Sequence, residues 1–246
     1  MSYERVSAVR ARIALAVQRV RPAWRAYEFL KASVYVRPVD APYLFEMTET
    51  MCRVAPITEG GPRLVSLFRL ARTVIREGVP GDVVECGVAQ GGTAAVLARA
   101  VRASSRTVWL YDSFEGLPPP EAVDGAAAGQ YVGTCRGTLG EVQTTLARAG
   151  VRGERTRLVK GWFEDTLPNA EVSQIALLHV DGDWYRSVRT CLESLYDRVA
   201  PGGVVVIDDY GHWPGCRLAT DDFLRERQIR TPLVRVDSAR RYFRKP

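Results

Sequence analysis

From Pro62 onward, short apolar runs alternate regularly with segments whose apolar residues have helical spacing. Five short apolar runs, each bounded by turn residues, predict strands at 82–86, 107–111, 156–160, 175–181 and 203–208. Segments with helical spacing precede or separate these runs and predict helices at 62–78, 92–103, 138–149, 184–199 and 216–227. Repeated strand–helix–strand units build a parallel sheet with helices on both faces. The chain is therefore predicted to be an α/β protein with a doubly wound, mostly parallel sheet.

Both ends of the chain depart from this alternation. Segments 232–237 and 240–245 lie too close together for a helical crossover, so we predict an antiparallel C-terminal hairpin at one edge of the sheet. Residues 1–61 are predicted to form an N-terminal helical extension, because apolar residues recur there at helical spacing until Pro22 interrupts them. This extension packs on the body of the protein (62–246), on a second subunit or, as a basic helix, on a membrane surface.

One long segment inside the body has no strand or helix pattern. Residues 115–137 are rich in Pro, Gly and Ala. Loops of this length in compact domains tend to be functional lids or disordered. Together with 35–60, this segment is the candidate cover of a substrate site.

Acidic residues follow two of the predicted strands. Asp181 and Asp183 come directly after one apolar run, and the pair Asp208-Asp209 comes after the next. The carboxyl ends of neighbouring parallel strands meet at one edge of the sheet, beside the crevice that binds ligands. We therefore expect Asp181, Asp208 and Asp209 to lie together, where their oxygens suit a hard cation such as Mg²⁺. Asp183 is interpreted as the cap of the helix that begins near Trp184.

A glycine-containing turn follows the first predicted strand and spans Glu85 to Gly92. Glycines such as Gly87 and Gly91 let the backbone approach a ligand closely. The turn lacks the G-x-G-x-x-G spacing of dinucleotide sites, and Glu85 would repel a pyrophosphate. A ligand with a cationic group suits this position better, and S-adenosylmethionine carries both an ammonium and a sulfonium. A purely structural tight turn is the alternative.

The next two strands end in residues suited to a nucleoside. Asp112 lies 112 − 87 = 25 positions after Gly87, where an acid can accept both hydroxyls of a ribose. A loop cap is the alternative for this residue. Trp162 and Phe163 follow the third strand and would pack either on an adenine ring or in the core. The strand tips together favour an adenosine-type ligand.

The two histidines stand in different settings. His179 lies inside an apolar strand and is interpreted as a core histidine with its hydrogen bonds satisfied. His212 lies in the loop after the acidic pair, beside Trp213, where a polar residue either contacts a substrate or has no such role.

Composition narrows the class of protein. A hydrophobic content of 46% and a charged content of 25% are ordinary for a globular protein. The net charge of +6 comes from scattered arginines with no aromatic–basic signature, which argues against a nucleic-acid partner. The five cysteines are widely spaced without a CxxC pair, which argues against disulfides and structural zinc. We expect no signal peptide, no membrane span and a reducing, cytoplasmic location.

Several linked motifs resemble the macrocin O-methyltransferase family over roughly residues 45–246. They are Glu85-Cys86-Gly87-Val88, Tyr111-Asp112-Ser113-Phe114-Glu115-Gly116-Leu117-Pro118, Gly161-Trp162-Phe163-Glu164-Asp165-Thr166-Leu167-Pro168, Asp181-Gly182-Asp183 with Tyr185, and Pro201-Gly202-Gly203 through Asp208-Asp209-Tyr210-Gly211. The resemblance implies a seven-stranded methyltransferase fold, S-adenosylmethionine as methyl donor, Mg²⁺ and a homodimer. It further implies methylation of a sugar hydroxyl on a glycosylated metabolite of macrolide or aminocoumarin type.

The resemblance also implies roles for individual residues. The metal ligands would be Asp181, Asp208 and Asp209, with Asp181 also acting as general base. Residues that would bind the cofactor are Glu85, Gly87, Gly91, Asp112, Ser113, Gly161 and Trp162. Thr48 belongs to a Thr-Glu-Thr-Met segment that looks like the family's lid. Residues expected near the small-molecule glycoside are Thr48, Tyr131 and His212.

Three other functions stay open on the sequence. A catechol-type or phenol-type methyltransferase would use the same metal chemistry on an aromatic hydroxyl. A nucleotide-dependent oxidoreductase is disfavoured by the missing phosphate turn. A non-catalytic protein would bind the donor without turnover, although the full acidic set argues against it.

Overall fold

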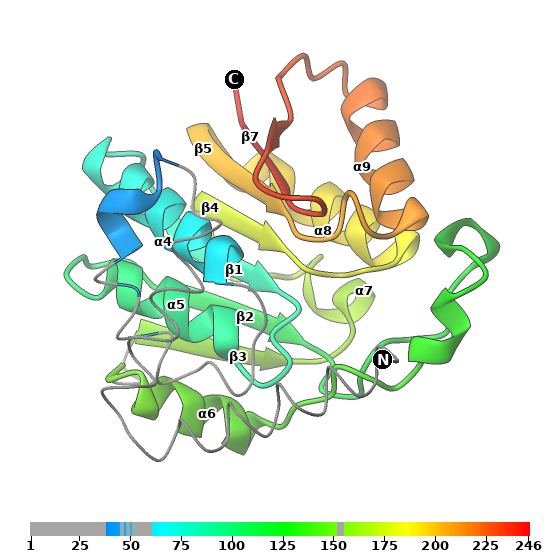
Figure 1. The fold of residues 1–246 in the computed structure, drawn as a ribbon, viewed down its shortest axis with the longest axis horizontal. Coiled ribbons are helices and arrows are strands. Elements are labelled where there is room, and N and C mark those ends of the chain that lie inside the picture. Colours follow the sequence, from blue (N-terminus) through cyan, green and yellow to red (C-terminus); the bar gives the residue numbers. More distant parts are fainter. Residues whose placement is uncertain (1–37, 45–46, 48–49, 51–60, 152–154) are drawn as a thin grey trace, which may run out of the picture.

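The computed structural model describes residues 38–44, 47, 50, 61–151 and 155–246 (Figure 1). Thr48, the helical pattern of residues 1–34 and most of the proposed cover at 35–60 lie outside the described residues. The first elements described are a short 3-10 helix, η1 (Ala41–Tyr43), and helix α4 (Gly61–Arg76). The predicted division at residue 61/62 therefore stays a prediction.

A seven-stranded sheet forms the centre of the molecule, in the order β3-β2-β1-β4-β5-β7-β6. Strands β1 to β5 are parallel, and β7 runs antiparallel to both β5 and β6, which confirms the predicted doubly wound sheet with a C-terminal hairpin. The strands are β1 (Asp82–Cys86), β2 (Val108–Asp112), β3 (Thr156–Lys160), β4 (Ile175–Val180), β5 (Val199–Ile207), β6 (Val234–Arg235) and β7 (Arg241–Arg244). Strand β5 begins earlier than its apolar run predicts, and β6 is only two residues long.

Helices cover both faces of this sheet (Figure 1). Besides α4 they are α5 (Gly92–Val101), α6 (Leu139–Arg148), α7 (Phe163–Thr166), α8 (Tyr185–Leu195) and α9 (Pro214–Glu226). The predicted helix 184–199 is interrupted after Leu195 and continues as a 3-10 turn, η6 (Tyr196–Arg198). Of the helices that the structure describes, none is long and apolar enough to cross a membrane.

The apolar runs form strands because both of their faces are buried. Side chains of a strand alternate between the two faces, so Val83 and Leu177 join the core under α4, α5 and α6, while Val84 and Leu178 join the core under α8 and α9. All six residues of β4 are buried. This two-sided burial explains why the strands read as continuous apolar runs rather than alternating ones.

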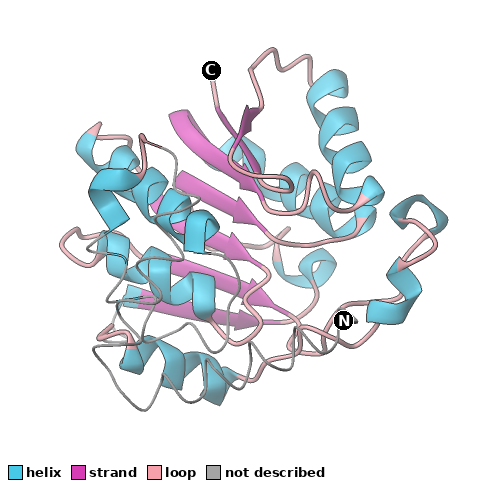
Figure 2. Ribbon diagram, in the orientation of Figure 1, coloured by secondary structure: helices cyan, strands magenta, loops and turns pink. Residues whose placement is uncertain are grey.

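The carboxyl ends of the parallel strands share one edge, where the loops of the site emerge (Figure 2). Between β1 and β4 the order of the strands reverses, and such a reversal opens a crevice for ligands. The amide of Asp181 donates to the carbonyl of Cys86 at 2.8 Å, and that of Asp208 donates to Val180 at 3.0 Å. These bonds extend the strand ladders to the acidic residues. Gly87 has φ 94°, and a Cβ there would collide with the carbonyl oxygen of Asp181, so only glycine fits this junction.

Candidate active site

A cleft of about 610 Å³ lies along this edge, a volume typical of small-molecule sites. Most of the residues predicted from the strand tips line it: Gly87, Asp112, Ser113, Trp162, Asp181, Asp208 and Asp209. The described residues Glu85, Gly91, Gly161, Tyr131 and His212 were also predicted but do not line it. The predicted cover segment contributes a stretch of the wall from Gly116 to Asp124, and also Cys135.

Asp112 is fixed against the glycine turn by backbone hydrogen bonds. Its Oδ2 accepts from the amides of Val88 at 2.7 Å and Ala89 at 2.9 Å, and its Oδ1 accepts from Phe114 at 2.6 Å. Three amide donors fix the orientation of this carboxylate. The acid therefore stands preorganised in the cleft, between the tips of β1 and β2.

The other predicted donor-side residues shape the cleft to different degrees. The hydroxyl of Ser113 accepts from the amide of Glu115 at 3.1 Å. Trp162 lines the cleft at the start of α7. Gly91 forms the N-cap of α5 with φ 85°, and the amide of Gly161 donates to the carbonyl of Asp112 at 3.0 Å. These two glycines support the cleft from behind rather than face it.

Three carboxylates cluster on the other side of the cleft. Asp181, Asp183 and Asp209 each place an oxygen within 4.8 Å of the other two. Burial, and then the charges of Asp208 and Asp209, raise the pKa of Asp181 well above its usual range. Burial and the charge of Asp209 do the same to the pKa of Asp183, and burial followed by the charge of Asp208 raises the pKa of Asp209 to about 6. Hard oxygen donors with this mutual repulsion fit a divalent cation such as Mg²⁺.

Asp183 was missed because it was interpreted as a helix cap, and that interpretation is wrong. Trp184 is the N-cap of α8, and the amide of Tyr185, the first residue of the helix, donates to Asp124 rather than to Asp183. Asp183 has a left-handed backbone, with φ 53°, and its Oδ1 accepts from the indole N–H of Trp213 at 3.0 Å. A capping acid needs an extended backbone and faces the amides of the first turn. The side chain instead lines the cleft.

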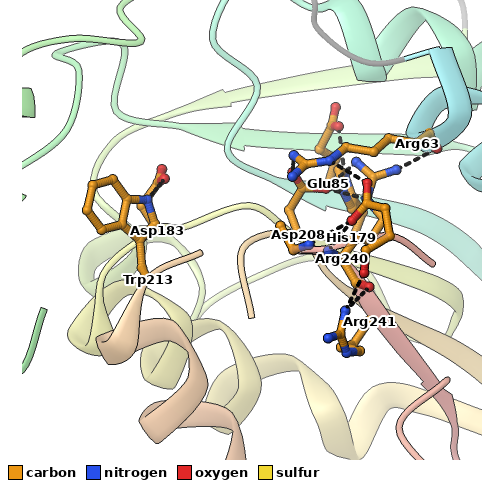
Figure 3. A network of polar contacts seen from close by, with 10 residues as sticks. Arg63, Glu85, His179, Asp183, Asp208, Trp213, Arg240 and Arg241 are labelled. Atoms are coloured by element: carbon orange, nitrogen blue, oxygen red, sulfur yellow. Dashed lines mark hydrogen bonds and ion pairs between the residues drawn. The ribbon is translucent and has the colours of Figure 1, made fainter. Parts of the chain in front are cut away.

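Asp208 meets Asp181 but is also engaged by basic residues (Figure 3). Both Nε and Nη2 of the buried Arg240 contact its Oδ1, and Nη1 of Arg63 lies 3.0 Å from its Oδ2. Burial alone would raise the pKa of Asp208, but Arg240, His179 and Arg63 outweigh it and hold this pKa well below the usual range. Asp208 therefore stays ionised, whereas the raised pKa values of Asp181, Asp183 and Asp209 favour their protonated forms. No motif in the sequence pointed to Arg63 or Arg240.

Glu85 lies beneath the cleft, fully buried. Its Oε1 is 2.9 Å from Nδ1 of His179, and Nε2 of the same ring is 3.3 Å from Oδ1 of Asp208. Oε2 of Glu85 has no hydrogen-bond partner among the described residues. The interpretation of His179 as a satisfied core histidine is confirmed. Glu85 is linked through this histidine to Asp208, which lines the cleft, and its predicted contact with a bound ligand stays a prediction.

The cover segment is pinned to the N-terminal end of α8. The buried Asp124, at the end of η3 (Ala122–Asp124), accepts from the amide of Tyr185 at 2.7 Å. The indole N–H of Trp184 donates to the carbonyl of Pro118 at 2.8 Å. A second short helix, η4 (Ala128–Tyr131), follows. The segment therefore forms a defined wall of the cleft. Figure 1 shows its backbone beyond the carboxyl ends of the strands.

The acidic cluster predicts an unusual dependence of stability on pH in metal-free protein. The folded-state pKa of Asp209, about 6, lies above the value of about 4 for an unfolded Asp. Its contribution to stability is therefore complete below pH about 4 and is lost as the pH rises through about 6. The free energy of unfolding should increase by about 1 kcal/mol between pH 7.5 and 5.5. Urea denaturation at these two pH values measures it. An Asp209→Asn variant should show a smaller increase, and a wild-type decrease would contradict the prediction.

A sheet of this order, with a small-molecule cleft at the strand reversal and carboxylates beside it, is that of a doubly wound α/β protein with a ligand site at the switch point. The family model described as macrocin-O-methyltransferase (TylF) matches residues 46–245, and the chain belongs to this family. The predicted resemblance is confirmed, and the protein is an O-methyltransferase.

Individual relatives agree with this assignment. The chain is 36% identical over 199 residues to the 8-demethyl-8-(2,3-dimethoxy-alpha-L-rhamnosyl)-tetracenomycin-C 4'-O-methyltransferase of Streptomyces olivaceus, covering 78% of this chain and 76% of the relative. It is 34% identical over 211 residues to the mycinamicin III 3''-O-methyltransferase of Micromonospora griseorubida, covering 81% and 82%. Among solved structures, the O-methyltransferase NovP matches with a TM-score of 0.69 and 32% identity, covering 76% of this chain and 80% of NovP.

Proposed function

We propose that this protein transfers a methyl group from S-adenosylmethionine to a hydroxyl of a sugar in a glycosylated small molecule, with Mg²⁺. The observation that carries the proposal is the cleft itself, which joins a nucleoside-type half around Gly87 and Asp112 to a carboxylate cluster. The names of two relatives support the acceptor class, since one modifies a rhamnosyl tetracenomycin and the other a mycinamicin.

The donor half is assigned by its fixed carboxylate. Asp112 is proposed to accept the ribose hydroxyls, with Gly87 and Ser113 along the methionine part and Trp162 against the adenine. Asp112 already accepts three amide hydrogen bonds, so it can bind a diol without moving. When bound, S-adenosylmethionine supplies the methyl group from its sulfonium. Glu85 keeps its predicted role toward the ammonium only as a proposal, because it is enclosed beneath the turn.

The acidic half is proposed to hold Mg²⁺ and to remove the proton. Asp181 and Asp209 are the proposed ligands. Asp208 is proposed as a third ligand, with Mg²⁺ replacing Arg63 as the partner of its Oδ2. A bound Mg²⁺ would lower the pKa of the acceptor hydroxyl. The resemblance assigned the proton to Asp181. We assign it to Asp183, because its side chain lines the cleft and Trp213 holds one of its oxygens.

Alignment of the acceptor hydroxyl with the methyl group is proposed to supply the remaining rate acceleration. The acceptor oxygen must lie in line with the sulfonium methyl and near van der Waals contact, and a fixed wall provides such alignment. The pinned segment 115–137 forms that wall on the acceptor side. Tyr131 and His212, which are exposed beside Trp213, and Thr48 are proposed to contact the sugar or the group that carries it.

Incubation with S-adenosylmethionine and a panel of glycosides and catechols tests the function. We expect methylated glycosides by mass spectrometry, with turnover dependent on Mg²⁺. Faster turnover of catechols would favour the phenol-type enzyme, and binding of the donor without turnover would favour a non-catalytic protein. An Asp197→Asn variant, which changes a surface acid paired with Arg227, serves as the control that should keep full activity. A homodimer in the cytoplasm is part of the proposal, and light scattering measures its assembly.

A further inference from the structure

Trp213 stands at the centre of a cluster of rings beside the acidic residues. Its ring packs edge-to-face on Trp184, Tyr131 and His212, with centroid distances of 4.9, 5.2 and 4.6 Å. Trp213 is nearly buried, whereas Tyr131 is 43% exposed. The cluster therefore joins three parts of the chain: the end of the cover segment, the start of α8 and the start of α9.

The backbone around Trp213 fixes where its indole points. Trp213 is the N-cap of α9, and Pro214 follows at the first helical position, where proline is preorganised for a helix. The amide of Trp213 donates to the carbonyl of Asp209 at 3.0 Å. Trp213 is thus tied through its backbone to one carboxylate residue of the cluster and through its indole N–H to another, Asp183 (Figure 3).

The hydrogen bond from Trp213 matters because it fixes the orientation of the Asp183 side chain. Its backbone is left-handed, a conformation that costs energy for a residue other than glycine. Among the described residues, Trp213 is the side-chain hydrogen-bond partner of its carboxylate. Since Oδ1 accepts from the indole, Oδ2 is left for the reacting hydroxyl. A carboxylate free to rotate would present its oxygen to that hydroxyl only part of the time.

We propose that Trp213 is a positioning residue that orients the Asp183 carboxylate toward the acceptor hydroxyl through its indole N–H. This inference rests on the proposed function, in which Asp183 takes the proton. Trp213 is not one of the residues that line the cleft, so it contacts Asp183 without touching the S-adenosylmethionine half of the cleft. Its loss should therefore lower kcat and leave the KM for S-adenosylmethionine unchanged.

Trp213→Phe is the decisive variant, because it keeps a ring in the cluster and removes only the N–H donor. We expect kcat to fall at least tenfold with an unchanged KM for the donor. Trp213→His keeps a ring N–H and should recover part of the loss; it also serves as the second variant if Phe does not fold. Phe223→Leu removes a comparably buried ring from the same helix, remote from the acid, and should lower Tm without lowering kcat.

A double-mutant cycle separates positioning from packing. If Trp213 acts through Asp183, then Trp213→Phe should cost nothing further in the residual turnover of Asp183→Ala. An equal loss in both backgrounds, or wild-type kcat in Trp213→Phe, would overturn the inference. The indole N–H resonance of Trp213, assigned by its absence in Trp213→Phe, should also shift in Asp183→Ala.

The two proposals fail differently. A wild-type protein that methylates no glycoside in the panel overturns the proposed function and the positioning role with it. A wild-type enzyme that turns over, together with an unaffected Trp213→Phe variant, overturns the positioning role alone.

Discussion

Asp181→Asn should lower the turnover number by about 10³-fold or more, a loss typical of removing a metal ligand or a major electrostatic group from an active site. Asp181 takes part in both groups of clustered donors, one with Asp183 and Asp209 and the other with His179 and Asp208. Replacing its charge therefore weakens every arrangement that could hold the ion. Asparagine keeps the shape of the side chain, and the backbone of Asp181 stays tied to Cys86, so the variant should fold.

Chelation and calorimetry make this expectation specific to the metal. Removal of divalent ions from wild type should reproduce the loss, and returning Mg²⁺ should restore activity. Titration calorimetry should show Mg²⁺ binding to wild type and little to Asp181→Asn, which tests the site without relying on turnover. Asp208→Asn tests whether Asp208 is also a ligand: weaker Mg²⁺ binding than in wild type would show that the ion replaces Arg63 as its partner. Undiminished methylation by the chelated enzyme would remove the metal from the proposed function.

The fold could be predicted from the sequence because burial on two faces leaves a strong pattern. All six residues of β4, five apolar residues and His179, are buried, and α4 ends at Arg76, two residues before the predicted end at 78. The less certain features were boundaries. β5 starts at Val199 because the residues after η6 already pair with β4, although Pro201 and Gly202 interrupt the apolar run.

The site was predictable only as far as strand tips define it. The neighbouring tips of β1, β4 and β5 brought Asp181, Asp208 and Asp209 to one edge, as parallel pairing requires. What the sequence could not give was which partner each carboxylate would face. Arg240 reaches Asp208 from the hairpin that β7 pairs onto β5, and such a contact depends on register rather than on any local motif.

Those long-range contacts separate two acids that look alike in sequence. Asp208 is neutralised by arginines, whereas Asp209, the next residue, is left with a raised pKa. Trp213, whose indole N–H donates to Asp183, lies 30 positions away in the sequence. Its hydrogen bond fixes the carboxylate of a residue that the sequence suggested was a helix cap. The chemistry of this edge is therefore set by tertiary partners, while its location is set by the sheet.

Arg240→Ala should lower the free energy of unfolding by about 3 kcal/mol, because it leaves a buried carboxylate with less compensation. The side chain of Arg240 is 1% exposed and that of Asp208 is 7% exposed. Arg240 also donates to the backbone carbonyl of Arg63 at 2.6 Å, so its loss removes this hydrogen bond as well. Chemical denaturation measures the change. Arg244→Ala, which breaks a half-exposed pair with Glu77, is the matched control and should cost about 0–1 kcal/mol.

The second substitution of a cycle tests the cause of this loss. Asp208→Asn alone should also destabilise, since it leaves the charge of Arg240 buried. In the double variant neither unpaired charge remains, so the loss should be smaller than the sum of the two single losses by at least about 1 kcal/mol. Strict additivity would mean that Arg240 stabilises the protein by packing alone. In that case the charge of Asp208 would be balanced by Arg63 and His179, and the charge of Arg240 would not contribute to stability.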